Sequence, residues 1–211
     1  MKVINESYSN LESYSVKFQN AKPFPHIVLD NFLDEIFFNN LDLENLNLDK
    51  DKGRKFETDI EKNKWASKNQ VLSENLKSII DELNKKFFLE NLYKLSGITE
   101  LFSTTEGNTA LANYHEMYKS GFLGTHVDHS SEPKTGSPHV LNIILYLTKN
   151  WEKEWGGETI LANHNGTVIK KKVEYKSNRA LIFLHSPFTF HGVTKIKDNL
   201  KKRSSIYVDY Y

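Results

Sequence analysis

The stretch VLNIILYLT, residues 140–148, decides the fold class, because its side chains separate into two faces at the spacing of a β-strand. Successive side chains of a strand point to opposite sides of a sheet. One face is wholly apolar and suits a packed core, and the other is mixed and suits the wet interior of a barrel. The apolar face holds Leu141, Ile143, Leu145 and Leu147, and the mixed face holds Asn142, Ile144, Tyr146 and Thr148.

Short runs of this kind, separated by turn residues, fill the chain from about residue 108 onward. Eight short strands after helices favour a jelly-roll-like barrel with helices supporting one sheet. We therefore predict a mainly β (α+β) protein, with one domain over 1–211 that has supporting helices and an entry strand in 1–107 and the barrel core in 108–211. The predicted strands are 109–118, 123–128, 139–148, 157–162, 167–175, 179–185, 190–196 and 204–210.

The first half of the chain carries weaker signals. Residues 24–30 predict a strand, and apolar residues between 33 and 41 recur at helical spacing. The highly charged segment 47–70 predicts a solvated connector. One apolar stripe from Leu76 to Leu92 predicts a single helix that Ser73 caps and that ends near Gly97.

Composition limits the classes of function. A net charge of +1 over 211 residues gives no general field for nucleic acid or an anionic membrane, so neither is an expected partner. The sequence has no cysteine and no long apolar run or basic, apolar leader, from which we expect a soluble cytoplasmic protein. Any metal must therefore be bound by nitrogen and oxygen atoms.

A candidate metal site begins in GFLGTHVDHS, residues 121–130. If this stretch is extended, His126 and Asp128 share one face, while His129 falls on the other face or in the following loop. A third ligand from HSPFTFHGV, 185–193, would complete a set of two histidines and one carboxylate, which suits a non-heme Fe(II) centre with open positions. We prefer His191 to its rival His185, because His191 begins a strand whereas His185 ends an apolar run.

An anion receptor follows in RSSIYVDY, residues 203–210. Arg203 and Ser205 share the polar face of this strand, and a guanidinium on a rigid strand suits bidentate binding of a carboxylate. Tyr146, on the mixed face of 140–148, is a further candidate for the same interior.

The ordered motifs resemble the Fe(II)/2-oxoglutarate-dependent dioxygenases, and among these the prolyl-4-hydroxylase-like branch of bacterial and phage type. The motifs are Tyr118-x-x-Gly121, His126-x-Asp128, LYLT at 145–148, WGGET at 155–159, His191-Gly-Val and Arg203-x-Ser205, and the opening FPHIVLDNFL at 24–33 is also similar. The resemblance implies a double-stranded β-helix that holds Fe(II) by His126, Asp128 and His191.

The resemblance also implies the reaction. The cosubstrate 2-oxoglutarate would chelate iron and place its distal carboxylate on Arg203, assisted by Tyr146 and Ser205, with Tyr118 near the cosubstrate or the substrate. Reaction with O2, with ascorbate as reductant, would release succinate and CO2 and hydroxylate an unactivated C–H bond. Many relatives use lysine as the carboxylate receptor, and Lys201 and Lys202 lie nearby, but strand alternation favours Arg203.

The substrate stays open at this point. Peptidyl proline is the leading substrate class by resemblance, and a free amino acid or another small metabolite is the alternative. A non-catalytic jelly-roll binding module is the rival from another class, and the intact set of metal ligands and Arg203 speaks against it. The loop 129–139 is either a substrate lid or a plain connection, and we expect its histidines, His129 and His139, to be exposed.

Overall fold

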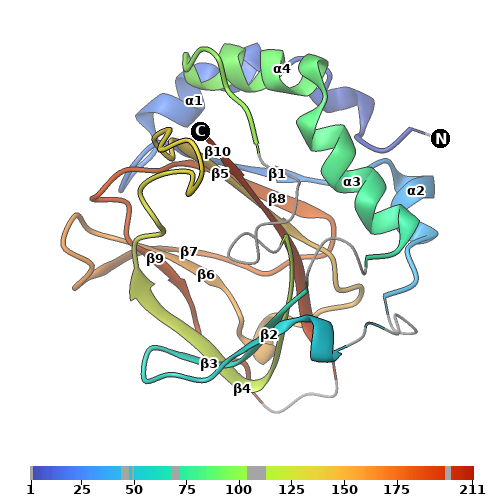
Figure 1. Ribbon diagram of the computed structural model, residues 1–211, viewed down its shortest axis with the longest axis vertical. Helices are drawn as coiled ribbons and strands as arrows, with labels where there is room; N and C mark the ends of the chain where they lie inside the picture. Colours follow the sequence, from blue (N-terminus) through green and yellow to red (C-terminus); the bar gives the residue numbers. More distant parts are fainter. Residues whose placement is uncertain (1, 44–47, 49, 68–71, 104–112, 198–200) are drawn as a thin grey trace.

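The computed structural model describes residues 2–211 except 44–47, 49, 68–71, 104–112 and 198–200 (Figure 1). Its helices are α1 (Ser15–Asn20), α2 (Glu35–Asn39), α3 (Glu74–Asn84) and α4 (Lys86–Ser96). Its strands are β1 (His26–Asp30), β2 (Arg54–Phe56), β3 (Glu61–Ala66), β4 (Tyr114–His126), β5 (Leu141–Tyr146), β6 (Thr159–Ala162), β7 (Ile169–Val173), β8 (Arg179–Leu184), β9 (His191–Val193) and β10 (Arg203–Tyr210). None of the described helices is both long and apolar enough to cross a bilayer.

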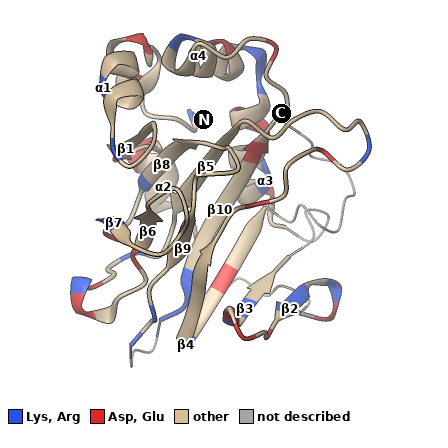
Figure 2. Ribbon diagram, turned by 90° about the vertical axis from the view of Figure 1, so that its left-hand side faces the viewer, with Lys and Arg blue, Asp and Glu red and all other residues tan. Residues whose placement is uncertain are grey.

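The strands of the described residues form one antiparallel sheet that folds over into a jelly roll. The strand order is β1-β8-β5-β10-β4-β9-β6-β7, and a hairpin of β2 and β3 joins it where β3 pairs with β4. Figures 1 and 2 show the helices over the layer that contains β1, β8, β5 and β10, with β4, β6, β7 and β9 on the far side of that layer. The predicted β core with helical support is therefore confirmed.

The two faces of β5 separate two hydrophobic cores, as the opening stretch predicts. Leu141, Ile143 and Leu145 pack in the larger core, which also contains the buried faces of α3 and α4. Ile144 and Tyr146 point the other way, into a smaller core inside the barrel with Leu161, Tyr175 and Leu181. The period of two along one strand thus separates the packed side of the sheet from the side where a ligand can enter.

The single helix predicted between Ser73 and Gly97 is wrong in one respect, because it is broken into α3 and α4 at Lys85. Ser73 caps the first helix and Gly97, with φ of 79°, ends the second, as expected. At the break, Lys85 is extended, with ψ of 143°, and the Asn84 side chain donates to the Ile80 carbonyl at 2.7 Å. Such side-chain bonds to the backbone compete with helix continuation. Both halves cover the same core, but the break turns Phe87 of the predicted stripe to solvent and buries Phe88 in its place.

The prediction of a solvated connector over 47–70 is also wrong for the part of that segment that the structure describes. β2 and β3 form a hairpin, and β3 pairs with β4 from Glu61 to Ala66 with an irregular register between Lys62 and Lys64. Only Trp65 and Ala66 at its end are buried. The sequence of β3 shows no alternation of apolar and polar residues, because its exposed positions are charged and Asn63, with a φ of 49°, interrupts the regular strand geometry. The strand could therefore not be predicted.

Two further strands of the prediction, 109–118 and 123–128, are one long strand, β4, over the described residues. Ser120, with φ of 64°, lies in its middle. The first half of β4 pairs with β10 and the second half with β9, so β4 passes from one layer of the barrel to the other. This continuity fixes the position of His126, the last residue of β4.

An ion pair at the end of β1 gives the fold a testable pH dependence. The Asp30 carboxylate accepts from Arg179 Nε at 2.6 Å and from Lys176 Nζ at 3.1 Å, and the hydrogen bond from Arg179 is the main cause that lowers the pKa of Asp30 below 3.8. A carboxyl with a lowered pKa in the folded state stabilises the protein above the unfolded pKa and loses that contribution as the pH falls through the folded pKa.

We therefore expect Asp30→Asn to lower the melting temperature at pH 7. Below pH 3.8 the difference in melting temperature between the variant and the wild type should shrink as the pH falls. Thermal unfolding followed by circular dichroism from pH 7 to pH 2 measures this. Asp81→Asn, which removes an exposed carboxylate from α3, is the control. A melting-temperature difference that stays constant over this pH range would contradict the assignment.

Candidate functional site

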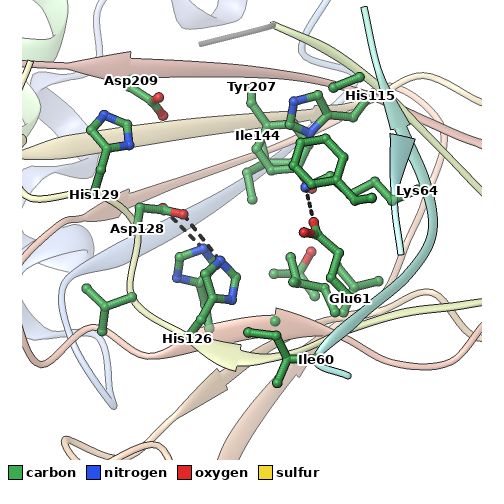
Figure 3. Close-up of a pocket in the computed structure, with 18 of the residues that line it drawn as sticks. Ile60, Glu61, Lys64, His115, His126, Asp128, His129, Ile144, Tyr207 and Asp209 are labelled. Atoms are coloured by element: carbon green, nitrogen blue, oxygen red, sulfur yellow. Dashed lines mark hydrogen bonds and ion pairs between the residues drawn. The ribbon is translucent and has the colours of Figure 1, made fainter. Parts of the chain in front are cut away.

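Three potential metal ligands converge at the mouth of the barrel. His126 ends β4, Asp128 follows two residues later, and His191 begins β9. His126 Nε2 lies 3.3 Å from Asp128 Oδ1, and His191 Nε2 lies 3.3 Å from Asp128 Oδ2 (Figure 3). One ligand atom from each residue lies within 4.8 Å of the others, so the three could hold one metal ion.

The outer ring nitrogens of both histidines face backbone carbonyls. His126 Nδ1 lies 3.0 Å from the Gly124 carbonyl, and His191 Nδ1 lies 3.2 Å from the Thr189 carbonyl. A proton on Nδ1 can be donated to each carbonyl, which leaves Nε2 free to coordinate a metal. The backbone thus orients both imidazoles toward Asp128.

The charges of this cluster are strongly coupled. Burial raises the pKa of Asp128, but the neighbouring His191 and His126 outweigh it and hold the pKa well below its usual value. Burial lowers the pKa of His191, but the Asp128 carboxylate outweighs it and raises that pKa. The Asp128 carboxylate therefore stays anionic between the two imidazoles. A metal cation bound by the three side chains would replace the positive charge that a proton on His191 supplies in its absence.

Gly192 allows the two strands of the site to meet. A Cβ atom at this residue would lie 2.5 Å from the Leu123 carbonyl oxygen and 2.9 Å from that of Gly124. Both oxygens belong to the backbone of β4, so neither can turn away. Any larger residue would push β9 off β4 and carry His191 away from His126.

A row of polar residues supports the Asp128 side. Asn142 on β5 donates from Nδ2 to Asp128 Oδ2 at 3.1 Å, and its Oδ1 lies 2.7 Å from His139 Nε2. The His139 ring stacks between those of His129 and His185, with centroids 4.9 Å and 4.0 Å away. His139 is buried, which corrects the expectation of an exposed loop histidine, because the stack and Asn142 draw it inward.

The rival third ligand, His185, faces a different set of atoms. Its Nδ1 lies 2.8 Å from the His139 carbonyl, and its Nε2 lies 3.4 Å from the Asp128 carbonyl. It is not part of the potential metal cluster among the described residues. The structure thus brings His191, and not His185, to the other two candidates.

Arg203 lies fully inside the barrel beneath aromatic rings. Its Nε donates to the Gly157 carbonyl at 2.9 Å, Nη1 to Ser205 Oγ at 2.9 Å, and Nη2 to Thr159 Oγ1 at 3.3 Å. Its guanidinium carbon lies 5.2 Å from the Tyr146 ring centroid and 4.7 Å from that of Tyr175. No carboxylate of the described chain forms an ion pair with this buried cation, which is the property of an anion receptor.

A cavity of about 380 Å³ opens onto the potential metal cluster, while Arg203, Ser205 and Tyr146 are not among the described residues that line it. The potential metal cluster lines it together with Thr159, the residue whose hydroxyl also receives hydrogen bonds from Arg203 and from the Tyr146 hydroxyl. The β2–β3 hairpin forms one wall through Ile60, Glu61 and Lys64 (Figure 3). The remaining lining residues include Asn113, His115, His129, Ile144, Tyr207 and Asp209.

Tyr118 lies elsewhere. Its hydroxyl donates to Glu116 Oε2, and Glu116 also accepts from Lys202 Nζ at 2.6 Å. Tyr118 is not among the described residues that line the cavity. Lys202 is held by the same carboxylate, and Lys201 Nζ donates to the Lys149 carbonyl at 3.2 Å, so both lysines lie apart from the Arg203 receptor.

Sequence reasoning missed several residues of this site. Tyr207 and Asp209 follow Arg203 and Ser205 at a spacing of two, so the alternation of β10 was the signal that they share the interior face. Gly157 and Thr159 carried no such signal, because a backbone carbonyl and a threonine hydroxyl are recognisable as partners of Arg203 only in the folded barrel.

The close approach at Gly192 yields a prediction with a matched control. We expect Gly192→Ala to lower the free energy of unfolding by about 1–3 kcal/mol, the usual cost of overpacking. Gly124→Ala on the partner strand should cost less, because the new Cβ would lie 3.4 Å from the Ile60 oxygen, an ordinary contact. Urea unfolding of both variants measures this, and equal losses would show that the β4–β9 approach is not restrictive.

Comparison with known proteins agrees with this geometry. Residues 110–208 match the model of the 2OG-Fe(II) oxygenase superfamily. No curated protein matches the chain significantly.

Several solved structures share the fold. A prolyl-4-hydroxylase from Pseudomonas putida matches with 15% identity and a TM-score of 0.63, over 96% of this chain and 97% of that one. A prolyl hydroxylase from Trichoplax adhaerens, in complex with a peptide fragment of the hypoxia inducible factor oxygen degradation domain, matches with 16% identity and a TM-score of 0.61, over 98% and 91%. A 2OG-Fe(II) oxygenase family oxidoreductase from Burkholderia pseudomallei matches with 15% identity and a TM-score of 0.62, over 98% and 91%.

At these identities the structures show a common fold, and the family model adds the class of chemistry. The residues that match that model contain the whole potential metal cluster and Arg203. Residues 110–208 are therefore a domain of the 2OG-Fe(II) oxygenase superfamily, an enzyme class that uses Fe(II), 2-oxoglutarate and O2.

Proposed function

We propose that His126, Asp128 and His191 bind the catalytic Fe(II) and that Arg203 binds the distal carboxylate of 2-oxoglutarate. The observation that carries the proposal is the pairing, in one barrel, of a three-ligand cluster with a buried guanidinium that has no carboxylate partner in the described chain. Two imidazoles and one carboxylate leave open positions on an octahedral metal, as a non-heme oxygenase requires. Bound Fe(II) would supply the activation of O2, of which one oxygen atom goes to the succinate that forms as 2-oxoglutarate loses CO2 and the other hydroxylates a C–H bond.

The chain's own residues would hold the cosubstrate. Ser205 and Thr159 orient the guanidinium of Arg203, and the Tyr146 hydroxyl, which donates to Thr159 at 2.6 Å, adds a further polar group at the same end. A cation fixed by its surroundings binds a carboxylate with little loss of side-chain entropy. Tyr118 is left out of this site, because its hydroxyl is bound to Glu116.

The proposed reaction is hydroxylation of a peptidyl proline. Support comes from the fold shared with prolyl hydroxylases, one of which is in complex with a peptide. The cavity is bounded on one side by the β2–β3 hairpin. The alternative is the same chemistry on a free amino acid or small metabolite, which the polar side chains among the lining residues could also bind.

Residues 1–211 would form one catalytic domain. β1 pairs with β8 in the main sheet and β3 pairs with β4, so the N-terminal half completes the barrel. A cysteine-free sequence fits the reducing cytoplasm.

The metal ligands are tested by changing both candidate histidines in the same way. We expect His191→Phe to weaken Fe(II) or Mn(II) binding by at least about 100-fold, because a ligand is lost, and His185→Phe by about tenfold or less, because that ring lies outside the three ligands. Anaerobic titration calorimetry gives the affinities, and succinate release with ascorbate present gives the turnover. The reverse order of losses would make His185 the third ligand.

The cosubstrate site is tested by Arg203→Met. Removing one partner of a buried charged pair costs about 2–5 kcal/mol, so the Kd for 2-oxoglutarate should rise about 30-fold or more. Calorimetry on Mn(II)-loaded protein measures it, and Lys201→Met serves as the control for a lysine that is not the receptor. An unchanged Kd in Arg203→Met, or a raised Kd in Lys201→Met, would refute the assignment.

A further inference from the structure

Asp209 presents a carboxylate to the cavity beside the potential metal cluster. It lies on the interior face of β10, directly opposite Asn142 of β5, and the Asn142 amide donates to Asp128. Directly opposed residues of antiparallel strands have neighbouring side chains. Figure 3 shows Asp209 above Asp128, on the cavity side of its strand.

This carboxylate has no hydrogen-bond donor in the described part of the chain. The nearest positively chargeable atom is His139 Nε2, at 3.7 Å, and that nitrogen already lies 2.7 Å from Asn142 Oδ1. Burial lowers the pKa of His139, so this ring is a poor counter-ion. A partly buried carboxylate without a hydrogen-bond donor is less favourable than one whose donor a ligand supplies.

Lys64, a cationic side chain that lines the cavity, already forms an ion pair with Glu61. Lys64 Nζ lies 2.6 Å from Glu61 Oε1 and 4.7 Å from the Phe56 ring centroid, so the hairpin neutralises its own charge (Figure 3). In the loaded site, the charge of Fe(II) balances the two carboxylates of 2-oxoglutarate, and Arg203 balances Asp128. Asp209 is then the negative charge that remains next to the reacting centre.

We propose that Asp209 binds a cationic nitrogen, an ammonium or a guanidinium, of the substrate that is oxidised. The inference rests on the proposed function and narrows its substrate class. The cation can be the α-ammonium of a free amino acid or a basic side chain next to the proline of a peptide. Both offer N–H donors and a positive charge to a carboxylate.

A structural role is the competing explanation. Asp209 would then only help to hold His139 and Asn142 behind Asp128. Loss of its charge would in that case change metal affinity and leave the choice of substrate unaffected. Binding of substrates and binding of metal must therefore be measured separately.

The experiment uses full-length protein loaded with Mn(II) and 2-oxoglutarate, so that binding is measured without turnover. The free-amino-acid arm compares L-proline and L-glutamate with their N-acetyl amides, which lack the α-ammonium. The peptide arm compares blocked X-X-Pro-X-X pools in which X is lysine, methionine or glutamate. Calorimetry gives each Kd, and succinate release under Fe(II) gives the stimulation of turnover.

We expect the cationic members of at least one arm to bind at least ten times more tightly than their neutral and acidic counterparts. The responding arm identifies the source of the cation. Asp209→Asn should remove the preference, while Asp209→Glu, which keeps the charge, and Asp81→Asn, which lies outside the cavity, should retain it. The Kd values for Mn(II) and 2-oxoglutarate in Asp209→Asn show that the variant is loaded.

Two results would overturn the inference in distinguishable ways. If wild-type protein loads with metal and cosubstrate but cationic members bind no better than neutral ones, the role of Asp209 is refuted and the proposed function stands. The same holds if the preference survives in a loaded Asp209→Asn variant. If wild-type protein binds neither Mn(II) nor 2-oxoglutarate, the proposed function itself fails.

Discussion

The close approach of β9 to β4 is the constraint on which the candidate site depends. The two strands carry His191 and His126, and Gly192 keeps their backbones near enough for both imidazoles to face Asp128. Hydrogen bonds from the rings to backbone carbonyls set the directions, so the site is built from strand geometry more than from side-chain packing. Positions fixed in this way can hold a ligand set ready for a metal ion.

The barrel solves a second problem, which is the burial of a full positive charge. Arg203 is covered by two tyrosine rings and held by hydroxyls and a carbonyl, none of which carries a negative charge. Thr159, which accepts a hydrogen bond from this guanidinium, also lines the cavity. The interior of the barrel therefore separates opposite charges: the Arg203 guanidinium lies in one part, and the carboxylates of Asp128 and Asp209 lie at the potential metal cluster and beside it.

Much of the fold and of the candidate site was predictable from the sequence, because side chains alternate between the two faces of each strand. The two faces of residues 140–148, the pairing of His126 with Asp128 and the shared face of Arg203 and Ser205 are local properties. The hairpin β2–β3 and the break at Lys85 were not, since charged exposed positions mask a strand and no breaker residue marks the helix. The burial of His139 could not be predicted either, because its stacking partners His129 and His185 lie 10 and 46 residues away in the sequence.

The sequence by itself determined the fold class, the identity of the candidate ligands and the residue that suits a carboxylate, because each depends on residue type and on spacing within one strand. Only the tertiary structure decided which histidine joins the other two ligands, that Tyr118 turns to Glu116, and that Asp209 faces the cavity without a donor among the described residues. Those outcomes depend on which strands lie side by side, and strand order is set by the packing of the whole barrel.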